Sequence, residues 1–246
     1  MLRQKSRNDR FGFTLAEVLI TLGIIGVIAA LTLPSLLAYY QDKVVVTKVK
    51  KAYSIFSQAY VKAIEANGGL QKEEWDCSAF QDTSDGSKAA RCYISYMLPY
   101  IKTINVCRVN GDLKDCKFSS FFHDNYQSTE MFSINGGTLG NLGDGGGGYA
   151  IAADGFEFMA YRNFIAIKTD RKEKNILNKN LFLFKLDTDK LTYYTCTKAT
   201  SVEHYLKGYN ISGCFVSAVD WILLYDNLDY MRCPNKVSIN GSHSCR

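Results

Sequence analysis

Two hydrophobic patterns follow one another at the start of the chain. From Phe13 to Leu37 most positions are apolar, and Glu17 is the one charged residue. Further along, apolar residues recur at steps of three or four with lysines mostly between them, which is typical of an amphipathic helix. These positions are Val45, Val49, Ala52, Phe56, Ala59, Ala63 and Ala66, and the lysines are Lys43, Lys48, Lys50, Lys51 and Lys62. The patterns predict one long helix over residues 13–67, which ends at Asn67-Gly68-Gly69.

The two halves of this helix have different expected surroundings. A bilayer crossing needs roughly 20 apolar residues, which residues 13–38 supply. Pro34 removes a backbone donor and crowds the preceding turn, so we expect a kink near it. The amphipathic half is expected to lay its apolar face on a globular domain. We expect its lysines to be solvated, with contact to anionic lipid headgroups or acidic neighbours as the alternative.

Glu17 is the unusual residue of the apolar half. A charge near the bilayer centre costs roughly 3 kcal/mol on insertion scales, so its presence indicates a use. Upstream lies a short basic leader with four basic residues against Asp9, namely Arg3, Lys5, Arg7 and Arg10. Positive charge stays on the cytoplasmic side, which predicts that the C-terminal part of the chain is exported.

The leader, Gly12, Phe13, Glu17 and the apolar run together resemble the N-terminus of type IV prepilins and pseudopilins. The resemblance implies that residues 1–12 are removed by a prepilin peptidase, which cuts between Gly12 and Phe13 and methylates the new amine of Phe13. It also implies that Glu17 pairs with the terminal amine of a neighbouring subunit in a filament. Pro34 stands where the family commonly has a helix-kinking proline, and Gly26 where the helix loosens.

This resemblance covers about the first fifth of the chain. It implies a pilin-like α+β fold, with the long N-terminal helix packed on a small antiparallel sheet and with disulfide-braced insertions. Residues 39–246 would form the exported globular domain, including the amphipathic half of the helix. An ordinary signal peptide or a plain membrane anchor is the alternative. However, Ala29-Ala30-Leu31 is a poor signal cleavage site, and neither alternative explains Glu17.

Eight cysteines also favour an exported domain, because none lies before residue 77 and an even count suggests disulfides in an oxidising compartment. They form two clusters in the sequence, Cys77, Cys92, Cys107 and Cys116, and Cys196, Cys214, Cys233 and Cys245. About a hundred pairings are open to eight cysteines, so the connectivity is not predicted. Zinc is the alternative, but the sequence contains no C-x-x-C motif.

The rest of the chain predicts an antiparallel sheet of three to five strands. The expected strands are Tyr149–Ala153, Glu157–Tyr161, Asn163–Thr169, Leu181–Leu186 and Leu191–Cys196, with Asp154-Gly155 as a hairpin turn. Residues 89–104 are expected to form a short helix. Between Cys214 and Cys233, residues 218–224 are expected to form a helix or strand around a buried Trp221.

Two loops resemble ligand sites only in part. Residues 143–148 match G-x-G-x-x-G, but a strand rather than a helix is expected after them, so we interpret residues 135–148 as a loop. Some pseudopilins hold calcium in a loop before their last strands, and residues 170–175 occupy that place here. Three basic residues in this loop disfavour calcium, and we expect no cofactor and no metal.

No catalytic constellation is visible. His123, His204 and His243 are scattered, and no nucleophile elbow, metalloprotease or Walker motif occurs. The formal net charge is +5, but removal of the leader would leave about +2, so no nucleic-acid partner is predicted. The sequence therefore predicts a structural subunit of a type IV pilus or a type II secretion pseudopilus, and not an enzyme. A minor tip pilin that acts in adhesion or DNA uptake is the alternative.

The implied partners are prepilin peptidase, other pilin or pseudopilin subunits, the inner-membrane assembly platform and, before assembly, membrane lipid. The implied location is a single-pass protein of the inner membrane with its C-terminal domain exported, and then a surface pilus or a periplasmic pseudopilus.

Overall fold

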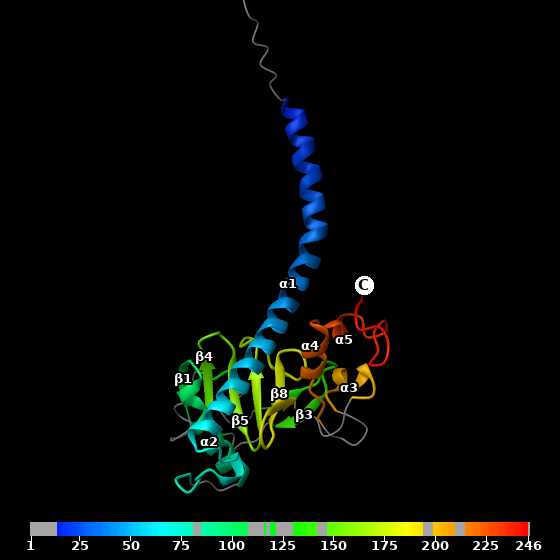
Figure 1. Ribbon diagram of the computed structural model, residues 1–246. Coiled ribbons are helices and arrows are strands. Elements are labelled where there is room, and N and C mark those ends of the chain that lie inside the picture. Colours follow the sequence, from blue (N-terminus) through cyan, green and yellow to red (C-terminus); the bar gives the residue numbers. More distant parts are fainter. Residues whose placement is uncertain are drawn as a thin grey trace, which may run out of the picture. The chain divides into compact units, whose positions relative to one another are not determined.

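The computed structural model describes residues 14–80, 85–107, 116, 119–121, 130–141, 147–193, 199–209 and 215–245. The chain divides into two compact units, Met1–Asp42 and Lys43–Arg246. One long helix, α1 (Leu15–Ala66), begins in the first unit and ends in the second (Figure 1). The predicted single helix is therefore confirmed. It continues through Pro34 without a break, and the expected kink there stays a prediction.

The end of α1 is set by the predicted stop. Gly68 and Gly69 adopt positive φ angles of 71° and 82°, a conformation that L side chains rarely adopt. The Gly69 N–H donates to the Ile64 carbonyl at 2.9 Å, and the Asn67 side chain donates to the Ala63 carbonyl at 2.7 Å. These bonds satisfy carbonyls that the helix end would otherwise leave without partners.

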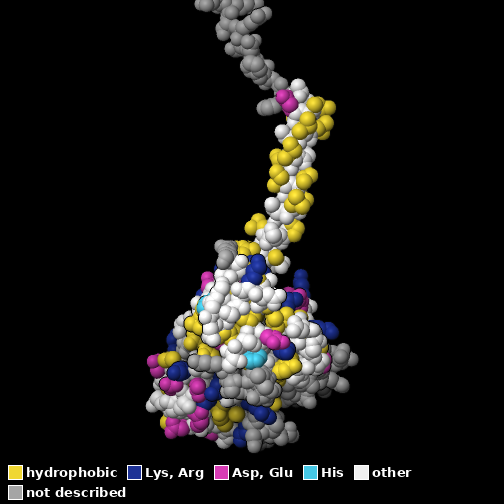
Figure 2. All heavy atoms as spheres, turned by 90° about the vertical axis from the view of Figure 1, so that its right-hand side faces the viewer, with side chains coloured by type: hydrophobic (Ala, Val, Ile, Leu, Met, Phe, Trp, Pro, Cys, Tyr) yellow, Lys and Arg dark blue, Asp and Glu magenta, His cyan; other side chains and the backbone are white. Residues whose placement is uncertain are grey.

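The first unit exposes its apolar side chains. Leu15 is 80% exposed and Leu31 is 76% exposed, and Figure 2 shows hydrophobic side chains all along this part of α1. By length and composition α1 can cross a membrane. This agrees with the apolar pattern of the sequence, which lacks a polar face.

The second unit is built on a six-stranded antiparallel sheet with the order β1-β4-β5-β6-β8-β9. Its strands are β1 (Thr103–Cys107), β4 (Tyr149–Ala152), β5 (Glu157–Tyr161), β6 (Phe164–Lys168), β8 (Leu181–Leu186) and β9 (Leu191–Tyr193). Phe56 of α1 is fully buried and lies edge-on to Phe158 of β5, with ring centroids 4.9 Å apart. The second half of α1 therefore packs on this sheet, and the predicted α+β pilin-like fold is confirmed.

The opposite face of the sheet carries a second core. Met159, Ala166 and Leu183 alternate along their strands with residues that face α1, so they lie on the other face. There they join a cluster that includes Phe121 and Met131. A small sheet with the order β3-β2-β7 contributes to this cluster. Its strands are β3 (Thr138–Asn141), β2 (Glu130–Phe132) and β7 (Asn175–Ile176).

Two predictions on secondary structure are wrong in part. The expected helix over residues 89–104 is instead α2 (Asp85–Met97), a 3-10 turn (Leu98–Tyr100) and the start of β1. Pro99 explains this break, because proline disfavours a helical residue before it and lacks an N–H. With β1 added, the sheet has six strands rather than three to five.

The glycine-rich segment 135–148 is also more than a loop, because β3 lies inside it. Gly140 pairs with Met131 next to a shift in register, a place where glycine is common in strands. A strand, β4, follows the G-x-G-x-x-G match, as expected, so the match lacks the helix of a dinucleotide site. Most of that match, residues 143–146, lies outside the described residues.

The C-terminal region holds three short helices, α3 (Val202–Lys207), α4 (Val219–Tyr225) and α5 (Asp229–Arg232). Trp221 of α4 is 1% exposed, which confirms its prediction as a core residue. The disulfides Cys77–Cys92, Cys107–Cys116 and Cys233–Cys245 each join cysteines of the same predicted cluster. Cys196 and Cys214 lie outside the described residues.

Candidate functional site

The start of α1 is capped by its own side chains. The Thr14 N–H and the Thr14 hydroxyl both donate to Oε2 of Glu17 at 2.8 Å. The Glu17 N–H lies 3.3 Å from Oγ1 of Thr14, to which it donates. This reciprocal arrangement is a capping box, which satisfies donors that the first helical turn leaves free. The T-x-x-E spacing was visible in the sequence, so Thr14 is a residue that sequence reasoning missed.

The other predicted residues of this segment are distributed along it. Gly12 and Phe13 lie outside the described residues. At Gly26 an added Cβ would meet nothing within 4 Å, and Pro34 lies inside the helix. Glu17, Gly26 and Pro34 are thus spaced along one apolar helix and do not form a pocket. The segment presents a surface for packing rather than a cavity for chemistry.

Beyond Asp42, four lysines of α1 contact the globular domain. Lys50 forms an ion pair with Asp226 at 2.9 Å and Lys43 one at 3.5 Å. Lys48 donates a hydrogen bond to the Thr169 carbonyl at 2.8 Å, and Lys51 forms an ion pair with Asp154. The expectation that these lysines are only solvated is therefore wrong. The two aspartates and the carbonyl that these lysines contact belong to the same globular unit and hold α1 on it.

Asp226 is the residue that receives two of these lysines. It follows α4 with φ of 56°, in the left-handed region that aspartate tolerates better than most residues. The hydrogen bond from Lys50 and the charge of Lys43 lower the pKa of Asp226. Sequence reasoning missed Asp226, because nothing local connects it with residues so far away along the chain.

A buried polar cluster lies on the face of the sheet opposite α1. Glu157 is fully buried, and its carboxylate accepts hydrogen bonds from the hydroxyls of Ser119 and Ser120 and from the Ser120 N–H. Arg171 approaches the same carboxylate at 3.4 Å. Arg171 belongs to the loop that was considered for calcium. Its guanidinium faces a carboxylate there, and the expectation that the loop holds no calcium stays a prediction.

Lys168 faces the same cluster. It pairs with Glu157 across β5 and β6 and is fully buried. Its Nζ donates to the Ser120 carbonyl at 2.6 Å. Burial lowers the pKa of Lys168 to about 8, against the opposing effect of Glu157 and Asp170. No local signal in the sequence pairs either charge with residues 119–121.

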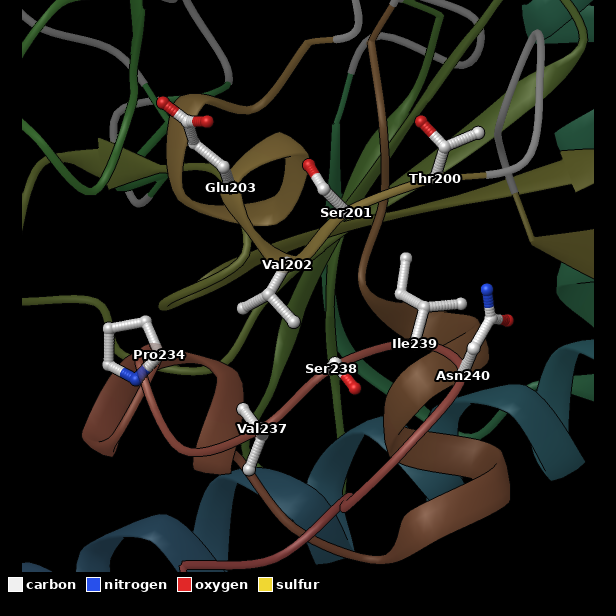
Figure 3. Close-up of a pocket in the computed structure, with 9 residues that line it drawn as sticks. All are labelled: Thr200, Ser201, Val202, Glu203, Pro234, Val237, Ser238, Ile239 and Asn240. Carbon is white, nitrogen blue, oxygen red and sulfur yellow. The ribbon is translucent and has the colours of Figure 1, made fainter.

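The C-terminal region contains an open cavity of about 320 Å³. Figure 3 shows its lining, which comes from the beginning of α3 and from the segment after α5. Glu203, the one charged residue there, pairs with Lys207 at 2.7 Å. The lining residues are Thr200, Ser201, Val202, Glu203, Pro234, Val237, Ser238, Ile239 and Asn240. This set holds no nucleophile paired with a base.

Asp229, Cys233 and Cys245 bring three potential metal ligands close together. Both cysteines are used in one disulfide, and Asp229 accepts a hydrogen bond from the Cys245 N–H at 2.9 Å. Metal ligation needs cysteine thiolates, so these three residues do not fit a zinc ion. The prediction that the chain binds no metal is otherwise untested.

Comparison with known proteins identifies the class. Residues 7–33 match the prokaryotic N-terminal methylation motif, the cleavage and methylation signal of type IV pilins and pseudopilins. With the long helix packed on an antiparallel sheet, this motif defines a pilin-like or pseudopilin precursor. Residues 35–215, more than half of the chain, match a family of unknown function (DUF6613), and the chain belongs to that family. No curated protein and no solved structure shows significant similarity.

Proposed function

We propose that the protein is a structural subunit of a type IV pilus or a type II secretion pseudopilus. The observation that supports this is the first half of α1, whose apolar side chains are exposed directly after a cleavage and methylation signal. Exposed apolar surface of this extent is typical of a surface that another molecule covers. Lipid covers it before assembly, and the helices of neighbouring subunits cover it in the filament.

In this proposal prepilin peptidase cuts between Gly12 and Phe13 and methylates the amine of Phe13. The inner-membrane assembly platform then moves the subunit from the bilayer into the filament. The globular domain is exported and ends on the cell surface or in the periplasm. No cofactor, metal or nucleic acid takes part.

Glu17 has two roles in this account. In the folded chain it caps α1 through Thr14. In the filament its negative charge pairs with the terminal amine of a neighbouring subunit. An unpaired carboxylate in an apolar core is strongly destabilising, so this pairing selects the register in which helices pack.

The two roles of Glu17 are separated by the variant Glu17→Gln. Glutamine serves in a capping box as glutamate does, but it carries no charge. We expect Glu17→Gln to be cleaved and methylated normally and to be largely absent from sheared filaments. The matched control is Thr14→Ala, which removes the cap at a cost of about 1 kcal/mol and should still assemble. Immunoblots of membrane and sheared fractions measure both results, and normal assembly of Glu17→Gln would contradict the charge role.

A minor tip pilin that acts in adhesion or DNA uptake is the second candidate. The size of the globular unit, Lys43–Arg246, and its disulfide-braced insert favour it over a small repeating subunit. Copy number separates the candidates. Quantitative mass spectrometry of sheared filaments would find a major subunit in excess over all others, and a minor one in trace amounts.

A further inference from the structure

The segment that follows α5 is closed into a ring. Cys233, directly after α5, forms a disulfide with Cys245, and residues 233–245 are called the C-terminal ring below. The far end of the ring also returns to α5, because the Cys245 N–H donates to the Asp229 carboxylate at 2.9 Å. In Figure 1 this segment is red and lies beside α4 and α5. The proposed filament function gives the ring no role.

The C-terminal ring holds the turn between α4 and α5. The imidazole of His243 stacks on the ring of Tyr225, the last residue of α4, with centroids 3.8 Å apart and planes 7° apart. The His243 carbonyl accepts a hydrogen bond from Nδ2 of Asn227 at 3.0 Å. Oδ1 of Asn227 accepts from Nε1 of Trp221 and from the Asp229 N–H, each at 2.9 Å. Asn227 therefore connects the ring with both helices.

Asp226 stands between Tyr225 and Asn227, the two residues that the ring contacts. Its φ of 56° is left-handed, and a residue other than glycine keeps such a conformation only where its surroundings determine it. Its backbone carbonyl accepts a hydrogen bond from Nζ of Lys43 at 3.0 Å, and its carboxylate pairs with Lys50 at 2.9 Å. A continuous set of contacts thus runs from the Cys233–Cys245 disulfide to α1.

These contacts reach α1 at the point where it enters the globular unit. Lys43 is the first residue of that unit. Val46, at 2% exposed, is the first buried residue along α1, and Val49 is the next. The contact between Lys43 and Asp226 therefore holds a turn of α1 that precedes the apolar packing on the sheet. The core alone does not fix this turn.

We propose that the Cys233–Cys245 disulfide controls the contact between Asp226 and the start of the second half of α1. When the disulfide forms, two S–H bonds break and one S–S bond forms. The two protons and two electrons that the thiols lose pass to a disulfide of an oxidising partner, which becomes a dithiol. An oxidising compartment supplies such a partner, and a reducing compartment keeps the thiols.

The physical reason is the entropy of the C-terminal ring. An open segment has many conformations, and the disulfide removes most of them. One stacked pair and a few hydrogen bonds then suffice to order the turn around Asp226. Coupling between separate sites needs an element with two discrete arrangements, and the closed and open ring are these two. The inference concerns the single folded chain and not the filament, so each can fail without the other.

The test is hydrogen exchange, followed by mass spectrometry, in the full-length chain in detergent. The double variant Cys233→Ser/Cys245→Ser opens the ring and leaves the other disulfides in place. We expect the amides of residues 225–229 to exchange about tenfold faster than in the wild type. Those of residues 43–48 should exchange about threefold faster, because they lose a largely exposed ion pair and one hydrogen bond. The amides of β5 and β6 should not change.

The matched control is Cys77→Ser/Cys92→Ser, which removes a disulfide that closes a loop of similar length. It should leave the exchange of residues 43–48 unchanged relative to β5 and β6. Asn227→Ala cuts the path while the disulfide stays, so it should accelerate residues 43–48 as the open ring does. It also carries the test if the double variant does not fold. Unchanged exchange of residues 43–48 in Asn227→Ala, or in a folded open-ring variant, would overturn the proposal.

Discussion

The two halves of α1 share one backbone and have opposite surroundings. In residues 15–42 large apolar side chains are exposed, with Ile20 at 63%. In residues 43–66 the apolar positions Val49, Phe56 and Ala63 are all 0% exposed. The helical conformation is the same, so secondary structure does not separate the halves. What separates them is whether the chain itself supplies the partner for the apolar surface.

The sequence pattern encodes this difference. The second half has a polar face and an apolar face, and the sheet covers the apolar face. The first half has no polar face, so water is a poor solvent on every side of it. A helix of this kind is stable in lipid or among other helices. The second half of α1 therefore contributes to folding of the globular unit, and the first half is the surface that we propose for assembly.

The largest expected effect is a difference between the two halves of α1 in how much a substitution lowers the free energy of unfolding. Phe56→Ala removes a fully buried ring and should lower the free energy of unfolding by about 3–5 kcal/mol. Leu31→Ala, in the exposed half, should leave it unchanged. Both tryptophans, Trp75 and Trp221, lie in the globular unit, so their fluorescence during urea titration of the full chain in detergent reports on that unit. Equal losses in both variants would contradict the division.

A charge placed in the first half should have the converse effect. Val27→Arg puts a cation in the middle of the apolar run and should oppose membrane insertion by about 3 kcal/mol. Membrane-bound protein should fall while the urea midpoint of the globular unit stays the same. Val61→Arg is the control, because Val61 lies in the second half and is 46% exposed. If Val27→Arg remained fully membrane-bound and assembled, the first half would not be the membrane and filament surface.

The smallest expected effect concerns the ion pairs that hold the second half on its domain. Lys50 lowers the pKa of Asp226, so the carboxylate contributes stability above its unfolded pKa, about 3.9. That contribution is lost as the pH falls through the lower folded pKa. Because the pair is largely exposed, Asp226→Asn should cost at most about 1 kcal/mol near pH 7 and nothing near pH 2.

Asparagine tolerates the left-handed backbone conformation of Asp226. The substitution Asp226→Asn therefore removes the charge and keeps the backbone conformation. Urea titrations at the two pH values measure the difference between variant and wild type. A cost that is equal at both pH values would show that Asp226 acts through packing and not through Lys43 and Lys50.

Local signals predicted much of this molecule. The two hydrophobic patterns that predicted α1, the glycines that end this helix and the Asp154-Gly155 hairpin are all local features of the sequence. The structure confirms each of them. The Thr14–Glu17 capping box was equally local and could have been found by its spacing. At this level the sequence determines the structure through short-range sterics and hydrogen bonds.

Contacts between distant segments could not be predicted. β1 pairs with β4, although a helix was expected over the first residues of β1. That expectation failed because a short apolar run is compatible with a helix and with a strand. β7 pairs in parallel with β2, which requires a long connection that leaves no local mark. The hydrogen-bond partners of Glu157 and Lys168 are Ser119 and Ser120. Only the folded chain brings these residues together, so the buried polar cluster could not be predicted from local sequence patterns.

The most direct test of the account is the mass of the N-terminus of the protein recovered from sheared filaments and from cell envelopes. The account predicts a chain that begins at N-methylated Phe13 in both fractions. A chain that begins at Met1, or one cleaved after Ala30, would contradict it. The first half of α1 would then be a plain anchor or a removed signal, and the proposal of filament assembly would fall.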